Sequence, residues 1–186
     1  YHPLFEDPLT LGELDQAIKQ LKQRKAPGPD KIHNEMIKHL GVFGKKALLH
    51  LINMTWEKGQ LPRTWKNAFL SPILKKDKDP KEPKSYRPIS LTSSIGKVGE
   101  RMINRRLYWW LEDSEVLTEN QAGFRAGSRT EDQLFRLCQD IQDGFQDSKH
   151  TTAVFIDLQQ AYDRVWRKGL LLKMQRMGIC GKYTTG

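Results

Sequence analysis

The amino-acid sequence predicts an α+β fold, and three observations lead to this prediction. Apolar residues recur at helical spacing through most of the first 60 residues. Two extended segments flank a lysine-rich loop between residues 61 and 91, and a run of four apolar residues at 153–156 is typical of a short buried strand. We therefore expect a helical N-terminal part, a small two-stranded sheet, and a further strand followed by helices.

The helical segments begin at recognisable capping residues. Thr10 and Glu13 have the spacing of a capping box, in which each side chain bonds to the other residue's backbone N–H. Asp30 is expected to cap a second helix, and either Ser128 or Thr130 to cap a later one. The expected helices are one that starts at residue 11 and ends before residue 26, and others over about 32–40, 43–58, 96–112, 131–145 and 168–177.

Composition narrows the class of protein. With 38 % hydrophobic and 28 % charged residues among 186, the chain has the composition of a globular domain, and it holds no run of 18 apolar residues that would predict a membrane span. There is no signal-peptide pattern, and Cys138 and Cys180 form no CxxC pair, so we expect an intracellular protein with reduced thiols, in the nucleus, the cytoplasm or both. The missing initiator Met indicates a piece of a longer protein.

Positive charge is concentrated in one segment. The net charge is +9, and residues 75–106, which we call the basic stripe, contribute +6 of it through ten basic and four acidic side chains. Such a local excess favours a polyanion such as nucleic acid, although a solvated surface loop has the same composition. Segments 61–74 and 86–91 are expected to pair as a hairpin with a basic tip, and Pro72 indicates an edge strand.

The apolar run at 153–156 ends directly in Asp157. A carboxylate at the end of a buried strand needs a partner, and the usual partners are a base, backbone donors or a metal ion. After three residues the chain continues with Ala161, Tyr162 and Asp163. From these residues two interpretations remain open. Either Asp157 caps a following short helix while Tyr162 packs in the core, or the whole spacing serves catalysis.

The spacing of two apolar residues, Asp, three residues, Ala, Tyr and Asp at 155–163 resembles the first catalytic-aspartate motif of reverse transcriptases. The Val-Trp pair that follows, then residues 169–171 and 177–179, resemble the non-LTR (LINE-like) retrotransposon branch. Four further segments resemble that branch in the expected order: residues 25–30, 75–76 with 85–91, 96–101 with 105–107, and 121–130. One departure is Lys31, where the family commonly has Gly. The resemblance covers about residues 5–180.

The resemblance implies a partial right-hand polymerase fold. Its N-terminal helices and fingers β-hairpin would occupy about residues 1–115, and the fingers–palm junction and the start of the palm, with the first palm strand and helices, about residues 116–186. It also implies an RNA-directed DNA polymerase that copies retrotransposon RNA by Mg²⁺-dependent nucleotidyl transfer. The implied partners are an RNA template, a DNA primer and deoxynucleoside triphosphates, and the oligomeric state is left open.

The resemblance gives four residues candidate roles in binding the reacting nucleotide and its metal ion. Asp157 would be the catalytic residue and would bind Mg²⁺, which clamps the attacking and leaving oxygens. Arg87, together with Lys75 or Lys76, would bind the phosphates of the incoming nucleotide, because nucleotidyl transfer needs negative charge to be neutralised. For Arg87 the alternative is a salt bridge at the sheet edge. Which of the two lysines acts stays open.

Further roles follow for the sugar and the template. The backbone at Leu158 would hold the triphosphate, and Tyr162 would stack under the deoxyribose and exclude a 2′-hydroxyl by its bulk. Template or RNA-backbone contacts are implied for Arg101, Arg105, Gln121, Phe124 and Arg125. The alternatives are core packing for Tyr162, a structural turn with a core Phe for the loop at 121–125, and ordinary helix packing for the two arginines and the neighbouring Arg106.

The second carboxylate motif of the family, a Tyr/Phe-x-Asp-Asp turn between two strands, does not occur in these 186 residues. We therefore expect the chain to be inactive alone, because one aspartate cannot hold both ions of a two-metal site well. The alternative function is a non-catalytic, nucleic-acid-binding relic of a reverse transcriptase. A maturase of the group II intron type is a third candidate, against which Trp166 and the motifs at 169–171 and 178–179 argue.

Overall fold

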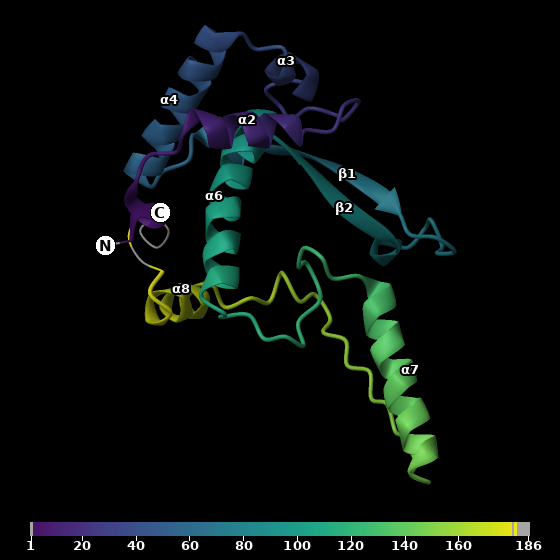
Figure 1. Cartoon of the computed structure of the whole chain (residues 1–186). Helices are drawn as coiled ribbons and strands as arrows, with labels where there is room; N and C mark the ends of the chain where they lie inside the picture. The colour runs from purple at the N-terminus through teal and green to yellow at the C-terminus, as the bar shows by residue number, and fades with distance from the viewer. Residues whose placement is uncertain (1, 180, 182–186) are drawn as a thin grey trace. The chain divides into compact units, whose positions relative to one another are not determined.

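The computed structural model describes residues 2–179 and residue 181, and the chain divides into two units (Figure 1). The first unit comprises the residues up to Trp110 together with the segment from Met174, and the second runs from Leu111 to Lys173. Cys138 is exposed and forms no disulfide, whereas Cys180 lies outside the described residues. No described helix combines the length and the apolar character that a membrane span requires.

The described elements are helical except for one two-stranded sheet, which agrees with an α+β class. The first unit contains α1 (Pro3–Glu6), α2 (Leu11–Lys19), α3 (Asn34–Lys38), α4 (Val42–Lys58), α5 (Arg63–Lys66), β1 (Ala68–Leu74), a 3₁₀ turn (Pro83–Ser85), β2 (Tyr86–Thr92) and most of α6 (Ser94–Asp113). The second contains α7 (Thr130–Gln146) and the start of α8 (Arg167–Arg176).

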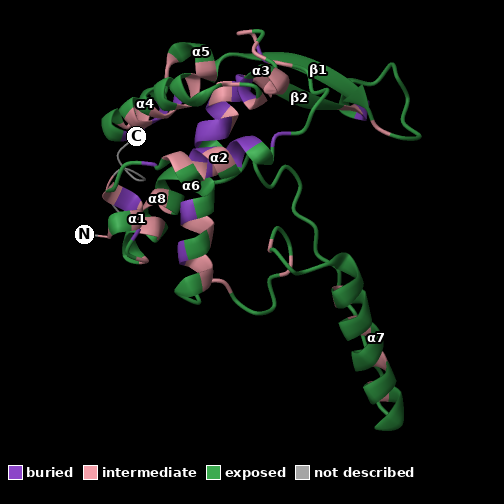
Figure 2. Ribbon diagram, turned by 45° about the horizontal axis from the view of Figure 1, so that its top comes forward, coloured by how far each residue is buried: buried purple, intermediate pink, exposed green. Residues whose placement is uncertain are grey.

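The core of the first unit forms between α2, α3, α4 and α6. Its buried members are Leu9, Leu14, Ala17, Ile18, Leu21, Ile37, Leu48, Ile52, Val98 and Met102. Helical spacing places the α2 members on one face of that helix, so they pack together when the helix forms. Figure 2 colours buried residues purple on α2 and α6, whereas α7 carries none. The stable packing of the chain therefore lies in its first unit.

The predicted capping box at the start of α2 is confirmed. The Thr10 hydroxyl accepts a hydrogen bond from the Glu13 backbone N–H at 3.3 Å, and the Thr10 N–H donates to the Glu13 carboxylate at 2.7 Å. α4 ends where the sequence changes to Gly59, whose φ of 60° lies in the left-handed region. Glycine adopts that region without steric cost, so it stops the helix cleanly.

The prediction that Asp30 caps the second helix is wrong. The Asp30 carboxylate instead accepts from the backbone N–H of Ile32 at 3.1 Å and closes a turn, and α3 begins only at Asn34. A short acidic side chain can bond to the backbone two residues on, and that local bond competes with helix capping. The intervening Lys31 has a φ of 56°, in the left-handed region. Glycine adopts this region without steric cost, so a glycine at this position would fit the turn better than lysine.

Replacing Lys31 by Gly should stabilise the first unit. A non-glycine residue in the left-handed region costs about 1–2 kcal/mol, and part of the gain is returned because glycine loses more entropy on folding. We expect the free energy of unfolding to rise by about 0.5–1 kcal/mol in urea titrations. Lys31→Ala is the control, since it removes the exposed side chain but keeps the strained φ. An equal gain in both variants would contradict the backbone explanation.

Neither Ser128 nor Thr130 caps α7, contrary to the prediction. Arg129 precedes the first helical residue, and its backbone N–H donates to the carboxylate of Asp132 at 2.8 Å. In a capping box, the side chain of the third helical residue accepts a hydrogen bond from the backbone N–H of the cap residue. Asp132 makes this bond to Arg129, and no hydroxyl at the cap is needed for it. The helix itself, predicted over 131–145, is confirmed.

The predicted hairpin is confirmed, with one correction. β1 and β2 pair antiparallel, and Ser71 lies opposite Ile89 in the register. Within the first extended segment, however, Arg63–Lys66 form the short helix α5, and Trp65 packs against the core of the first unit. Partial burial of this large aromatic ring accompanies the departure from the extended conformation.

The predicted buried strand that ends at Asp157 is absent. Residues 151–158 have no regular secondary structure, and Val154, Phe155 and Ile156 are 77 %, 84 % and 85 % exposed. β1 and β2 form the single sheet of the described residues, so this segment has no partner strand. An unpaired strand leaves its N–H and C=O groups without ladder bonds, and apolar content alone does not supply them. The first palm strand and the carboxylate at a sheet edge are therefore wrong for this structure.

Arg106 ties the N-terminal segment to α6. It is 7 % exposed, and its guanidinium donates to both oxygens of Glu13, at 2.5 and 2.9 Å. It also donates to the backbone carbonyls of Leu4, Asp7 and Pro8 at 3.2, 2.7 and 2.8 Å. Burial alone would raise the pKa of Glu13, but the bonds from Arg106 and Thr10 outweigh it and lower that pKa. Arg106 is therefore engaged within the fold of the first unit. This agrees with the alternative role of helix packing given for this arginine in the sequence.

Candidate nucleotide and nucleic-acid interface

The hairpin presents one face that carries both basic and apolar residues. Residues paired directly across an antiparallel ladder lie on the same face, and successive residues alternate between faces. The Lys75 N–H donates to the Ser85 carbonyl at 2.8 Å and extends the ladder by one pair. The register therefore places on one face Phe69, Ser71, Ile73, Lys75, Arg87, Ile89 and Leu91, which we call the arginine face.

The arginine face is open to solvent at its polar and apolar positions alike. Phe69, Ile73 and Ile89 are 56 %, 49 % and 43 % exposed, and Arg87 is exposed as well. Among the described residues Arg87 has no ion-pair partner, so the sheet-edge salt bridge is not found. A cation beside exposed aromatic and aliphatic surface is the composition of a site that receives phosphates and bases.

The two candidate lysines differ in their surroundings. The Lys75 ammonium donates to the backbone carbonyl of Lys84 at 2.8 Å, across the base of the tip loop. Lys76 is exposed, and no described residue forms an ion pair with it. The tip is further closed by the Tyr86 hydroxyl, which donates to the Pro80 carbonyl at 3.0 Å. Lys75 thus helps to shape the tip, and Lys76 projects from it.

The base of the hairpin is fixed by a residue whose role the sequence did not reveal. A Cβ atom at Gly28 would lie 2.5 Å from the carbonyl carbon of Thr92 and 2.7 Å from the nitrogen of Ser93. The loop of Pro27 and Pro29 thus touches the end of β2 backbone to backbone, and only glycine allows this approach. The sequence shows a glycine between two prolines, which indicates a tight turn. It does not show that this turn contacts Thr92, which is 64 residues further along the chain.

The candidate template residues fall into two groups. Arg105 and Gln121 are exposed, and Phe124 is 92 % exposed with a φ of 62°, so it is not a core residue. Arg101 is half-buried and donates to the Ala17 carbonyl at 3.3 Å. Arg125 donates to both oxygens of Glu112, at 3.0 and 2.6 Å, and to the Thr118 carbonyl at 2.8 Å. Arg125 therefore holds its own loop together.

The candidate catalytic segment is not assembled into a site. Asp157, Leu158 and Tyr162 are all exposed, and Tyr162 is 78 % exposed rather than packed in a core. Among the described residues no group of three or more His, Cys, Asp or Glu side chains could hold a metal ion. Asp157 alone supplies one carboxylate, so these residues do not fit a complete magnesium site.

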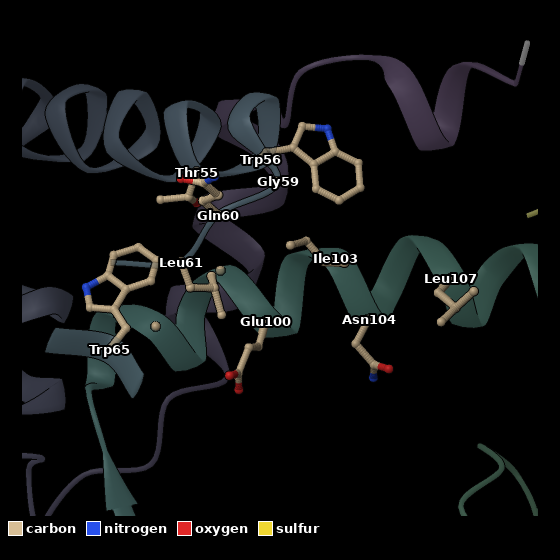
Figure 3. A pocket seen from close by; sticks show the side chains of 12 residues that line it. Thr55, Trp56, Gly59, Gln60, Leu61, Trp65, Glu100, Ile103, Asn104 and Leu107 are labelled. Carbon is tan, nitrogen blue, oxygen red and sulfur yellow. The ribbon is translucent and has the colours of Figure 1, made fainter. Parts of the chain in front are cut away.

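A separate hollow lies between the C-terminal end of α4, α5 and the middle of α6 (Figure 3). It measures about 370 Å³, and its walls include Trp56, Trp65, Leu61, Ile103 and Leu107. In Figure 3 the side chains of Glu100 and Asn104 point away from the Trp56 ring, so the hollow is mainly apolar. None of the candidate nucleotide-binding, template-binding or catalytic residues lines it.

Comparison with known proteins connects these segments to a family. The profile of the reverse transcriptase (RNA-dependent DNA polymerase) family matches residues 73–185, from within β1 through the Asp157 segment. The chain belongs to the reverse transcriptase family. This confirms the prediction made from the ordered motifs, and the match covers more than half of the chain.

Curated relatives place the chain in the non-LTR branch, as the motifs predicted. It is 39 % identical over 170 residues to the probable RNA-directed DNA polymerase from transposon BS of Drosophila melanogaster, covering 91 % of this chain and 19 % of that protein. It is 36 % identical over 169 residues to the RNA-directed DNA polymerase from mobile element jockey of the same organism, covering 91 % of this chain and 18 % of that one. The chain spans about a fifth of the length of these relatives.

Proposed function

We propose that this reverse transcriptase chain forms the fingers and the start of the palm of an enzyme that copies retrotransposon RNA into DNA. The observation that carries the proposal is the arginine face, on which Lys75 and Arg87 share one side of the hairpin with exposed Phe69 and Ile89. Cations neutralise phosphates, and exposed aromatic surface stacks on bases. The partners proposed are an RNA template, a DNA primer and deoxynucleoside triphosphates. The proposed location is inside the cell, in the nucleus, the cytoplasm or both.

Arg87 and Lys76 are the proposed ligands of the incoming triphosphate. The Arg87 guanidinium offers a planar fork of donors that matches two phosphate oxygens, and the Lys76 ammonium adds a mobile point charge. Lys75 is proposed to orient the tip, because its ammonium already donates to the Lys84 carbonyl. The Leu158 backbone is proposed to hold the triphosphate, and Tyr162 to exclude a 2′-hydroxyl.

Asp157 is proposed as one ligand of Mg²⁺. When bound, that ion would neutralise charge that develops during phosphoryl transfer. The described residues do not complete the ligand set, so the proposal for this chain is restricted to the single carboxylate. For the same reason we propose that the 186-residue chain does not polymerise by itself.

The template is proposed to contact side chains of one loop and of helix α6. Phe124 offers a freely exposed ring for stacking, Gln121 an amide, and Arg105 a charge on α6. Arg101 is proposed to contact phosphate from its half-buried position. Arg125, engaged with Glu112, is proposed to hold the loop that presents Phe124.

A second candidate function is a non-catalytic, nucleic-acid-binding relic. The observation that favours it is the exposed and irregular segment around Asp157, which lacks the neighbours of a working site. The two candidates share RNA binding and differ in catalysis. Only a longer polypeptide that carries this chain and the second carboxylate motif can separate them.

The chain should bind single-stranded RNA in a salt-dependent manner without regard to sequence. Neutralising roughly six phosphates predicts a slope of log affinity against log salt of about −4 to −5 on single strands. Fluorescence anisotropy with labelled oligouridylate and oligoadenylate between 50 and 200 mM salt measures this slope. Affinity that stays constant over that range would contradict the proposal and would identify the basic stripe as a solvated surface.

A further inference from the structure

A small cavity lies at the base of the hairpin, at the end opposite to the tip. It measures about 280 Å³ and opens between the loop after α2 and the first turns of α6. Four basic side chains line it: Lys22, Lys25, Lys97 and Arg101. No acidic residue is among its lining residues. We call this cavity the basic pocket.

The walls of the basic pocket are held in place by contacts already present in the structure. The Asn34 side-chain amide donates to the Lys22 carbonyl at 2.7 Å, and Arg101 donates to the Ala17 carbonyl at 3.3 Å. The close approach of Gly28 to Thr92 fixes the same loop against the end of β2. The backbone around the hollow and the Arg101 side chain are therefore held in place before an anion enters, which lowers the entropic cost of binding.

Among the described residues, no carboxylate forms an ion pair with a cation of the basic pocket. Glu35 on α3 accepts a hydrogen bond from the Arg24 backbone N–H at 2.5 Å. Asp30 accepts from the Ile32 N–H at 3.1 Å. Four like charges around one hollow repel one another unless an anion joins them, so the arrangement favours a ligand with concentrated negative charge. Ser94, in the first turn of α6, adds a hydroxyl, and the positive end of the helix dipole points the same way.

The pocket is continuous with the arginine face. Leu91 belongs to that face by the register and also lines the pocket. Arg87 lies four residues before Leu91, which at strand spacing is about 13 Å. Between the two cationic ends lie the exposed side chains of Phe69 and Ile89. Cations at both ends of an exposed aromatic and aliphatic surface are the arrangement that single-stranded nucleic acid recognises.

We propose that the basic pocket binds a backbone phosphate of single-stranded RNA whose neighbouring nucleotides lie along the arginine face. This inference rests on the proposed function and adds to it a phosphate anchor separate from the triphosphate ligands at the tip. Binding in the pocket should not depend on the base, because lysine and arginine contacts to phosphate carry no sequence information. The proposal also gives a role to Lys22 and Lys25, which lie outside the basic stripe in sequence but line the pocket together with Lys97 and Arg101.

The test compares two triple variants with equal loss of charge. Lys22→Gln, Lys25→Gln and Lys97→Gln together remove three pocket cations and leave Arg101 in place. Lys46→Gln, Lys58→Gln and Lys66→Gln remove three exposed lysines that do not line the pocket. Circular dichroism of the 186-residue chain confirms that both variants remain folded. If the pocket triple does not fold, the three single variants replace it in the same measurements.

Anisotropy with an oligouridylate of about 12 nucleotides gives the outcome. We expect the pocket triple to lose roughly tenfold in affinity and its salt slope to flatten by about 0.7, the value of one phosphate on a single strand. The control triple should lose less than threefold and keep its slope. Equal losses in both triples would overturn the pocket while leaving the proposed RNA binding intact. If the unmodified chain does not bind RNA at all, the proposed function fails together with the pocket.

A second arm distinguishes the RNA backbone from a free phosphate. Calorimetric titration with inorganic pyrophosphate should show binding at least tenfold weaker than that of the oligonucleotide, because only the oligonucleotide also contacts Phe69 and Ile89. Tighter binding of pyrophosphate, abolished in the pocket triple, would overturn the proposal and would assign the pocket to a small phosphate compound. An oligonucleotide that competes with pyrophosphate only in the unmodified chain supports the proposal.

Discussion

Asp157→Asn should abolish polymerisation in a longer polypeptide that carries this chain together with the family's second carboxylate motif. Asparagine keeps the shape of the side chain and removes the charge that holds a metal ion. Losing one charge-stabilising group in a preorganised site costs on the order of 10³-fold in rate, and a lost metal ligand should cost at least that. Primer extension on an RNA template with Mg²⁺ measures the effect. The 186-residue chain serves as the zero-activity control.

The same substitution should leave stability nearly unchanged. Asp157 is exposed in an irregular segment and has no ion pair among the described residues. The free energy of unfolding of the 186-residue chain, measured in urea, should therefore change by less than about 0.5 kcal/mol, as is typical of surface substitutions. Tyr162→Ala is the matched variant in the longer polypeptide. It should keep polymerisation and lower discrimination against ribonucleotides. An Asp157→Asn protein that unfolds, with a folded fraction that stays fully active, would establish capping and contradict the catalytic role.

Local signals predicted the features that neighbouring residues determine. The capping box of Thr10 and Glu13 and the end of α4 at Gly59 need only contacts within one turn, and both are present. The hairpin was predictable because its strands are close in sequence and its tip is rich in turn residues. The family was predictable for another reason. Ordered motifs along the whole chain are specific even where each one is weak.

Features that depend on distant partners could not be predicted. The apolar run before Asp157 has the composition of a strand, but a strand exists only beside another strand, and the described residues offer none. The basic pocket combines Lys22 and Lys25 with Lys97 and Arg101, about 75 residues apart in sequence. Asp30 shows that even a local feature can be ambiguous in sequence. An aspartate can either close a turn or cap a helix with the same carboxylate, and here it closes a turn.

Arg106→Ala should destabilise the first unit more than any other single change considered for this chain. It removes five hydrogen bonds and leaves the Glu13 carboxylate and three backbone carbonyls without their common donor. Removing one partner of a buried charge pair costs about 3–5 kcal/mol, and because the Glu13 carboxylate is only partly buried we expect a loss near about 3 kcal/mol. Urea unfolding at pH 7 measures the loss. Arg105→Ala, one residue earlier and exposed, is the control and should change the free energy of unfolding by less than about 0.5 kcal/mol.

Acid should reveal the same interaction independently. The pKa of Glu13 in the folded chain lies below its usual value of 4.5, so the charged pair stabilises the fold fully above that value and is lost as the pH falls through the lowered pKa. On acidification from pH 7 to below 4, the unmodified chain should therefore lose more stability than the Arg106→Ala variant. Arg106→Lys should recover only part of the loss, because an ammonium cannot reach two carboxylate oxygens and three carbonyls from one position. Equal acid sensitivity of the unmodified and Arg106→Ala chains would contradict the ion pair as the source of stability.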